Sequence, residues 1–355
     1  MKSYGSCIDM SANEKRRAKL TDIAAKTGYT VGTISKALQN REGISPKTRE
    51  NIIRAAREVG YIANAQAGGL RSGSSKTVAI IVSDIANPLF AIEIKQCVQA
   101  LEANGYRAIV MDTEERSDRE EQAIISALSK NVDGVLVCPT QKSKESIQLL
   151  QKNGMPFVLL GRRFQDLDAD YIVCDDEKGG YLAGKHLAEL GHRRILLITA
   201  DPCISSSLER LRGFERAMRE CGIEIDPRLI LQSDATGQEA GCMVCRAMDD
   251  GLNFTAVFSF SDYIAWEIIY SLNQRGVRIP QDLSVMGFDD VQSHMRFPPP
   301  LTTVHFPKRM ISNLSVELLL RRIRGDADDT VHTVLDTYLV PRETTAAPRE
   351  RGLGC

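Results

Sequence analysis

The chain has 355 residues, of which 43% are hydrophobic, 26% are charged and 6% are aromatic. This composition is typical of a folded globular protein and excludes a disordered chain, a fibre or a disulfide-rich miniprotein. The longest apolar runs are short, such as Val78–Val82, whereas a membrane helix needs roughly 18 apolar residues in a row. At about 150 residues per domain, the length predicts two or three domains.

Cysteine usage and the N-terminus indicate the compartment. The nine cysteines are odd in number and scattered along the chain, which fits reduced thiols better than a disulfide framework. The first ten residues contain no apolar core of the kind found in secretion signals. We therefore expect a cytoplasmic protein without a membrane partner. No cofactor or metal is expected either, because the histidines and cysteines do not cluster at metal-ligand spacings.

The net charge of −1 hides an asymmetry. Residues 1–76 contain 14 Lys and Arg against 6 Asp and Glu, whereas the remainder contains 31 against 40. A basic N-terminal segment on an acidic body indicates a polyanionic partner such as DNA. A solvated basic tail would show the same charge, so composition alone leaves both interpretations open.

Three short helices are predicted within residues 20–61. The first covers Leu20–Thr27 and ends at Gly28, and the second follows Thr30 as N-cap and runs to about Leu38. The third begins after Ser45 as N-cap, with Pro46 at the first helical position, and stops at Gly60. Residues 1–18 are expected to be a flexible tail.

The spacing of Ala24, Gly28 and Ile34 favours a helix-turn-helix. Two helices that cross over a short turn need a small residue at their contact, a glycine in the turn and an apolar plug on the second helix. The second helix would then enter the major groove of DNA. Its predicted base-reading residues are Val31, Gly32, Ser35 and Lys36. Residues expected near phosphates are Tyr29, Thr30, Thr33, Lys47, Thr48 and Arg49. A three-helix cap with ordinary polar surface residues remains the alternative.

Residues 63–76 are small, polar and rich in Gly and Ser, which is typical of a linker. Asn64 is a candidate cap for a short helix ending near Leu70. Two adjacent glycines destabilise that helix by about 1 kcal/mol each, so the isolated linker should be mostly unfolded.

From Thr77 onward the chain alternates between strands and helices. The predicted strands are Val78–Ser83, Ala108–Met111, Gly134–Cys138, Phe157–Leu160, Tyr171–Cys174, Ile195–Thr199, Ala256–Phe260 and Ser284–Phe288. The predicted helices lie near residues 88–104, 118–130, 143–153, 177–190, 207–221, 237–250 and 262–275. Apolar strands that each precede an amphipathic helix favour parallel sheets covered on both faces. There are too many strands for one compact sheet, so an α/β body of two lobes is predicted.

Ligands of parallel sheets bind beyond the carboxyl ends of the strands. The residues just after the predicted strands are therefore pocket candidates: Asp84, Asn87, Phe90, Asp112, Thr113, Arg162, Asp201, Ser261, Asp262 and Asp289.

Several phrases of the chain, in order, resemble the lactose/galactose repressor (LacI/GalR) family of transcription regulators. In the N-terminal segment they are Leu20–Ala24, Thr33–Leu38, Lys47–Glu50 and Val59–Ile62. In the body they are Ala86–Phe90, His186–Leu187, Leu190–Ile195, Arg210–Phe214, Ser284–Asp290 and Pro299–Val304. The match covers about residues 20–344.

The resemblance implies a fold and a mechanism. The body would resemble periplasmic sugar-binding proteins, with two doubly wound lobes joined by three crossovers and a small effector in the cleft. A homodimer, or a tetramer, would present its helix-turn-helix domains to a pseudo-palindromic operator. The linker would fold into a hinge helix on DNA, with Leu70 wedged into the minor groove. Effector binding would then change the spacing of the two hinges.

The resemblance also implies roles for pocket residues. Arg210, three residues before Gly213, and Asp289, after Gly287 and Phe288, match positions that bind sugar hydroxyls or charged groups. They would suit a polyol or a carboxylate-bearing ligand, and Phe90 would stack on a ring. The implied effector site is Asn87, Phe90, Asp112, Arg162, Arg210, Ser261, Asp262 and Asp289. A surface helix position for Arg210, a cap or ion pair for Asp289 and a core position for Phe90 remain the alternatives.

The predicted organisation is a DNA-binding domain over residues 19–62, a linker over 63–76, a body over 77–344 and a tail over 345–355. Lobe 1 would take about 77–175 and 305–335, and lobe 2 about 176–304 and 336–344. The function favoured is a transcription regulator, which the family resemblance implies to be a repressor controlled by a sugar or sugar derivative. A solute-binding module without DNA function is the main alternative. An enzyme is disfavoured because no nucleophile, base and orienting group stand together.

Overall fold

The computed structural model of the protein describes residues 18–62, 74–234, 237, 239–294, 296, 299–326 and 329–349. The chain divides into two compact units, residues 1–73 and residues 74–355. The predicted N-terminal tail up to residue 17 and the linker residues Asn64 and Leu70 lie outside the described residues.

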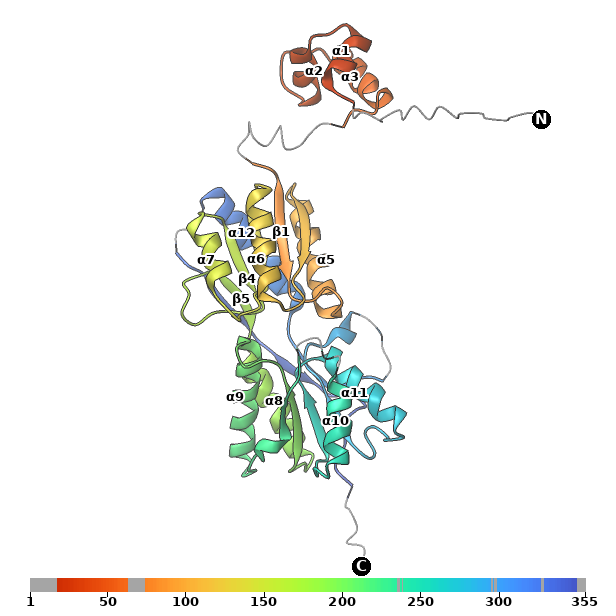
Figure 1. The fold of residues 1–355 in the computed structure, drawn as a ribbon, viewed down its shortest axis with the longest axis vertical. Coiled ribbons are helices and arrows are strands. Elements are labelled where there is room, and N and C mark those ends of the chain that lie inside the picture. The colour runs from red at the N-terminus through yellow and green to blue at the C-terminus, as the bar shows by residue number, and fades with distance from the viewer. Residues whose placement is uncertain are drawn as a thin grey trace, which may run out of the picture. The chain divides into compact units, whose positions relative to one another are not determined.

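The first unit is a bundle of helices α1 (Leu20–Thr27), α2 (Val31–Leu38) and α3 (Pro46–Glu58) (Figure 1). Gly28 closes α1 in the left-handed conformation at φ 74°, which lets the chain turn sharply into α2. The core is formed by small and β-branched apolar side chains: Ile23, Ile34, Ala37, Ile52, Ala55 and Ala56. Because few side chains form this core, the helix caps contribute noticeably to the stability of the unit.

Both predicted caps are confirmed. The Thr30 hydroxyl accepts a hydrogen bond from the Thr33 amide at 3.2 Å, and the Ser45 hydroxyl accepts one from the Thr48 amide at 3.1 Å. Each cap satisfies an amide that the first helical turn leaves without a partner. The caps therefore fix where α2 and α3 begin.

The second unit opens with lobe 1, a parallel sheet of β1 (Thr77–Val82), β2 (Arg107–Asp112), β3 (Gly134–Val137), β4 (Phe157–Leu160), β5 (Tyr171–Cys174) and β11 (His332–Leu335). The strand order is β11-β5-β4-β3-β1-β2. Alternate residues of β1 point to opposite faces. Val78 and Ile80 pack in the cluster with α5 (Pro88–Ala103) and α12 (Lys308–Arg324), whereas Ala79 and Ile81 pack with α6 (Ser117–Ser129) and α7 (Glu145–Lys152). Both faces are thus covered by helices.

Lobe 2 repeats the architecture with β6 (Ile195–Thr199), β7 (Ile230–Gln232), β8 (Ala256–Ser259) and β9 (Ser284–Met286), in the parallel order β7-β6-β8-β9. Leu197 faces α8 (Asp176–Glu189) and α9 (Ser205–Glu220), and Leu196 and Ile198 face α10 (Ala240–Asp249) and α11 (Asp262–Gln274). Single turns of 3₁₀ helix cover Pro227–Leu229 and Val291–Ser293.

The chain passes between the lobes after β5, after β10 (Thr303–His305) and after β11. At the second and third passages β10 pairs with β12 (Tyr338–Val340) as an antiparallel ladder. The C-terminal ends of both parallel sheets therefore face the junction between the lobes (Figure 1). The predicted class, an α/β body of doubly wound parallel sheets behind a helical N-terminal unit, is confirmed.

Helices α8 and α9 pack unusually closely because each has a glycine at the crossing. A Cβ built on Gly180 would lie 2.0 Å from the Arg210 carbonyl oxygen, and one on Gly213 would lie 1.8 Å from the Glu177 carbonyl oxygen. Any other side chain at these positions would force the helices apart. The pair fixes the position of Arg210 relative to the start of α8.

Some elements differ from the sequence prediction. Strands β7, β10, β11 and β12 and the long helix α12 were not predicted. The predicted tail is wrong for residues 345–349, because the His192 ring bonds the Ala346 carbonyl at 2.9 Å and the Ala346 amide donates to Ser284 at 3.1 Å. These partners lie far away in sequence, so a local pattern does not reveal them.

Candidate functional site

The outward face of α2 carries the side chains predicted to read bases. Ile34 and Ala37 point into the core, and their burial leaves Val31, 41% exposed, and Lys36 on the open face. Gly32 is exposed and Ser35 is half-buried on the same helix. A helix that presents a small, an apolar and a cationic residue can approach base edges closely and donate to guanine.

The residues predicted near phosphates fall into two groups. Thr30, Thr33 and Lys47 lie at helix starts, where the positive end of the helix dipole suits an anion, although the Thr30 hydroxyl bonds the Thr33 hydroxyl and amide at 3.0 and 3.2 Å. Thr48 pairs with the Ser45 hydroxyl at 2.8 Å, and Tyr29 packs on the core.

Arg49 is different, because its guanidinium points at the turn after α2. It donates to the Asn40 side chain and, at 2.6 Å, to the Arg41 carbonyl. This arginine therefore shapes the turn that follows α2.

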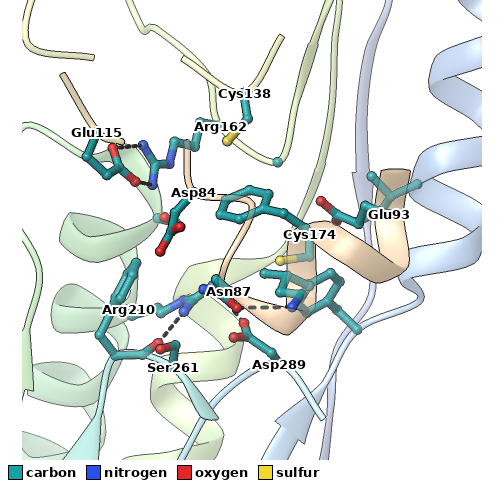
Figure 2. A pocket seen from close by; sticks show the side chains of 17 residues that line it. Asp84, Asn87, Glu93, Glu115, Cys138, Arg162, Cys174, Arg210, Ser261 and Asp289 are labelled. Carbon is teal, nitrogen blue, oxygen red and sulfur yellow. Dashed lines mark hydrogen bonds and ion pairs between the residues drawn. The ribbon is translucent and has the colours of Figure 1, made fainter. Parts of the chain in front are cut away.

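A cavity lies in the second unit where the carboxyl ends of the two sheets meet (Figure 2). The space between its lining atoms is about 640 Å³, and part of it is open to solvent. From lobe 1 and the crossovers it is lined by Asp84, Asn87, Leu89, Phe90, Glu93, Glu115, Cys138, Gly161, Arg162, Cys174, Phe306 and Ile311. From lobe 2 it is lined by Ser206, Arg210, Phe260, Ser261 and Asp289.

Arg162 follows β4 and is 5% exposed. Its guanidinium forms a two-pronged ion pair with Glu115, at 2.9 and 2.5 Å, and also donates to the Pro139 carbonyl at 2.9 Å. Burial lowers its pKa, but the charge and hydrogen bond of Glu115, together with other nearby groups, raise the pKa above its ordinary value. Arg162 therefore stays charged and is largely occupied by protein partners.

Arg210 projects from α9 and is 7% exposed. Its Nε donates to Asp176 at 2.7 Å, and its Nη1 donates to the Phe260 carbonyl. The guanidinium carbon lies 3.5 Å from the ring centroid of Phe288, a stacked geometry that suits a planar cation. Arg210 thus joins the start of α8 to the end of β8, and its remaining Nη2 lies 3.8 Å from Asp289.

Asp289 follows β9 in a strained backbone conformation, with φ at 119°. The side chain is 1% exposed, and neither carboxyl oxygen has a hydrogen-bond partner among the described residues. Burial raises the pKa of this carboxyl to about 7, against the opposing charges of Arg210 and Lys308. Strain and an unsatisfied buried acceptor are features that proteins retain at functional positions.

Glu93 lies on the inner face of α5 and is 3% exposed. Burial raises its pKa to about 8, and the neighbouring charge of Asp289 adds to the effect. The buried Lys308 donates to the backbone carbonyls of Asp289 and Phe306. Burial lowers the pKa of its ammonium, while the surrounding carboxylates oppose this.

Three further predicted residues line the cavity from helix starts. Asn87 caps α5 by accepting from the Leu89 amide at 3.0 Å, and Ser261 caps α11 by accepting from the Ile264 amide at 3.2 Å. Phe90 is buried on the cavity wall. For Asn87 and Ser261, the cap explains the residue type without any ligand.

Two predicted effector residues do not line the cavity. Asp112 accepts from the Ile85 and Glu114 amides at 3.3 Å, so it shapes the loop after β1. Asp262 is fully buried and accepts from the Thr303 hydroxyl at 2.6 Å and the Val291 amide at 2.8 Å. It ties α11 to the segment after β9.

The cavity also contains residues that the sequence did not single out, chiefly Glu93, Glu115, Ser206, Phe260 and Phe306. Glu93 could have been recognised from the sequence. It lies at helical spacing between Phe90 and Cys97, on the apolar face of α5, where a charged residue is unusual unless it is functional or paired.

Polar contacts join the two lobes beside the cavity. The Gln141 side chain accepts from the Ser205 amide at 2.8 Å and donates to the Arg163 carbonyl at 2.7 Å. Arg163 in turn pairs with Glu209 at 2.8 Å. Because α9 has no side-chain cap of its own, Gln141 of lobe 1 satisfies the first amide of a lobe 2 helix.

No described helix is long and apolar enough to cross a membrane.

Comparison with known proteins reveals the relationships of both units. Residues 19–64 match the family described as bacterial regulatory proteins, lacI family, and residues 185–345 match a periplasmic binding protein-like domain. The HTH-type transcriptional repressor PurR of Aliivibrio fischeri (strain MJ11) is 31% identical over 310 residues, or 86% of this chain and 92% of that repressor. The chain belongs to the lacI family of bacterial regulatory proteins.

Solved structures show the same fold for this lacI-family chain. A complex of the transcriptional regulator CelR with cellobiose is 29% identical and superposes with a TM-score of 0.70, covering 92% of this chain and 100% of CelR. The lac repressor dimer bound to operator and the anti-inducer ONPF superposes with a TM-score of 0.78, covering 94% and 100%. It is 24% identical and supports the fold alone.

The predicted family is therefore confirmed, and the protein is a DNA-binding transcription regulator with an effector-binding body. Its relatives are repressors rather than enzymes, so the enzyme interpretation is excluded.

Proposed function

We propose that this regulator represses transcription by binding a pseudo-palindromic operator as a dimer, and that a small sugar or sugar derivative in the cavity controls its affinity for DNA. In this proposal the outward face of α2 reads bases, and residues 63–76, including Asn64 and Leu70, form the hinge. The body senses the effector. We also propose that the protein acts in the cytoplasm, where its operator DNA lies.

The observation that carries the proposal is the cavity between the lobes. It collects side chains from the carboxyl ends of both sheets, and it contains the buried Asp289 carboxyl, whose oxygens have no donor among the described residues. A ligand hydroxyl could donate to Asp289 while Phe90 packs against a ring face. We propose Asn87, Phe90, Arg162, Arg210, Ser261 and Asp289 as the effector site.

The lobes give this cavity a means of control. A ligand that contacts both lobes stabilises the closed arrangement, and it shifts the equilibrium only by the difference between its affinities for the closed and open states. The Gln141–Ser205 and Arg163–Glu209 contacts belong to the closed arrangement described here. Effector binding and these contacts would therefore reinforce one another.

One neighbour supports the effector class proposed, because CelR is recorded in complex with cellobiose. One recognition helix reads only a half-site, so a dimer explains how a short helix-turn-helix reaches operator specificity.

The proposal is tested by selecting duplexes from a random DNA library with the full-length protein and measuring binding by fluorescence anisotropy with and without sugars. We expect an inverted-repeat motif and a sugar that changes the affinity at least tenfold. A protein that binds sugars but selects no duplex at low salt would be a solute-binding module. A protein that binds neither would refute the proposal.

A further inference from the structure

The charges that line the cavity do not balance. Four carboxyl groups face it, those of Asp84, Glu93, Glu115 and Asp289, against two guanidinium groups, those of Arg162 and Arg210 (Figure 2). This imbalance matters for ligand choice because charges in a partly desolvated cavity interact more strongly than charges in water.

The cations are already occupied by protein groups. Arg162 is engaged by Glu115 and the Pro139 carbonyl. Arg210 is engaged by Asp176 and the Phe260 carbonyl and is stacked on Phe288. The expectation that Arg210 suits a carboxylate-bearing ligand is therefore not supported by this geometry.

The surplus carboxyl groups are Glu93 and Asp289. Both are more than nine-tenths buried, and the oxygens of Asp289 accept no hydrogen bond from the described residues. The nearest buried amine, Lys308, directs its donors at backbone carbonyls and does not line the cavity. An isolated buried carboxylate is unfavourable unless a cation or donors reach it.

The remaining wall is aromatic. Phe90, Phe260 and Phe306 line the same space, and ring faces attract organic cations as well as packing on sugar rings. A ligand phosphate or carboxylate would find most guanidinium donors taken by protein groups, because only one terminal guanidinium nitrogen of the cavity, the Arg210 Nη2, 3.8 Å from Asp289, has no hydrogen bond among the described residues.

From this geometry we propose that the effector is a hydroxyl-bearing compound with a protonated amino group, such as an amino sugar, and that Glu93 and Asp289 receive the ammonium. This inference rests on the proposed function and names the ligand class of the same site. The ammonium supplies the donors that Asp289 lacks, and the aromatic wall covers the carbon skeleton.

The proposal has a consequence for pH. Burial raises the pKa of Asp289 to about 7 and that of Glu93 to about 8, so both bind protons near neutral pH in the absence of a cation. The charged groups that act on this pair come from several elements: Asp176, Arg210, Asp262 and Lys308. A ligand ammonium would displace the protons, so its affinity should rise between pH 6 and pH 8, whereas that of a neutral sugar should not.

The test uses full-length protein in an amine-free buffer and three matched ligand series. Each series has one sugar skeleton as amine, neutral sugar and acid: glucosamine, glucose and glucuronate, with the galacto and manno equivalents. Dissociation constants are measured by calorimetry at pH 6 and pH 8. We expect at least one amine to bind tenfold or more tightly than its neutral counterpart and to gain affinity at pH 8.

Variants separate this inference from the proposed function. Glu93→Gln should remove most of the preference for the amine, measured as the ratio of the dissociation constants of the neutral sugar and the amine. Glu102→Gln, on the exposed end of the same helix, is the matched control and should leave this ratio unchanged. A neutral or acidic member that binds as tightly as its amine, with binding lost in Asp289→Asn, would overturn the amine inference and retain the effector cavity. If no member of any series binds, the amine inference is overturned, whereas the proposed function is overturned only if the protein also selects no duplex.

Discussion

The buried carboxyl of Glu93 makes the stability of the body depend on pH in a direction opposite to that of a paired surface acid. Its pKa rises from 4.5 to about 8 because burial penalises the charged form, with a further contribution from Asp289 and opposition from Lys308. The folded protein therefore retains a proton at pH values where the unfolded chain has released it. The contribution of this group to the free energy of unfolding is fully present below pH 4.5 and is lost as the pH rises to 8.

The size of the effect follows from the pKa values. A difference from 4.5 to about 8 corresponds to roughly 5 kcal/mol when the group is fully ionised. Because Lys308 would reorganise around a charged Glu93 and offset part of this cost, we expect ionisation of Glu93 to lower the free energy of unfolding by on the order of 2–5 kcal/mol. Glu93→Gln keeps the size of the side chain and cannot ionise. The variant should match the parent protein at pH 5 and exceed its stability at pH 9.

The free energy of unfolding can be followed by urea denaturation at pH 5, 7 and 9. Trp266, the single tryptophan of the chain, lies in α11 and reports on the body by its fluorescence. Glu102→Gln serves as the control, because Glu102 is half-exposed in a surface ion pair with Arg107. If the difference between Glu93→Gln and the parent protein is the same at pH 5 and pH 9, the Glu93 carboxyl is not held protonated by burial and the reasoning fails.

Three other predictions concern DNA reading, helix packing and lobe closure. Lys36→Ala should weaken binding to a selected operator by about 1–3 kcal/mol more than binding to random duplex, and equal losses in anisotropy titrations would contradict base reading. Gly213→Ala should lower stability by about 1–3 kcal/mol or more, since its Cβ would lie 1.8 Å from the Glu177 carbonyl oxygen; an unchanged melting temperature would show that α8 and α9 are not in close contact. Gln141→Ala should destabilise the closed lobes by about 1 kcal/mol, the usual value for a helix cap, and weaken effector binding about fivefold in calorimetry. Full affinity in that variant would mean that the Ser205 amide finds another partner on closure.

The helical unit was predicted closely because its signals are local. Thr30 and Ser45 cap the helices that follow them, and Gly28 ends the helix before it. Each signal acts within a few residues, so a linear pattern contains the required information. The strands of both parallel sheets other than β7 and β11 were found for a similar reason, since buried parallel strands appear as short apolar runs.

The elements near the C-terminus were missed because their partners are distant. Strand β11 pairs with β5, more than 150 residues earlier, and β12 pairs with β10. Both are short and partly exposed, so they lack the continuous apolar run of a central strand. The packing of residues 345–349 on the body depends likewise on His192 and Ser284.

The site was predicted by position rather than by environment. The rule that ligands bind after parallel strands led to Arg162 and Asp289, which line the cavity, and also to Asp112 and Asp262, which bind neighbouring loops instead. The rule locates an edge of the sheet. It does not say which side chains there are occupied by protein partners.

The sequence by itself determined the helix starts, the two α/β lobes and the family, because caps, apolar runs and ordered motifs are properties of neighbouring residues. Only the tertiary structure decided that Arg210 is bound by Asp176 and the Phe260 carbonyl, and that Glu93 and Asp289 share one cavity without enough cations around them. The physical reason is that desolvation and charge pairing depend on distances between segments that folding brings together.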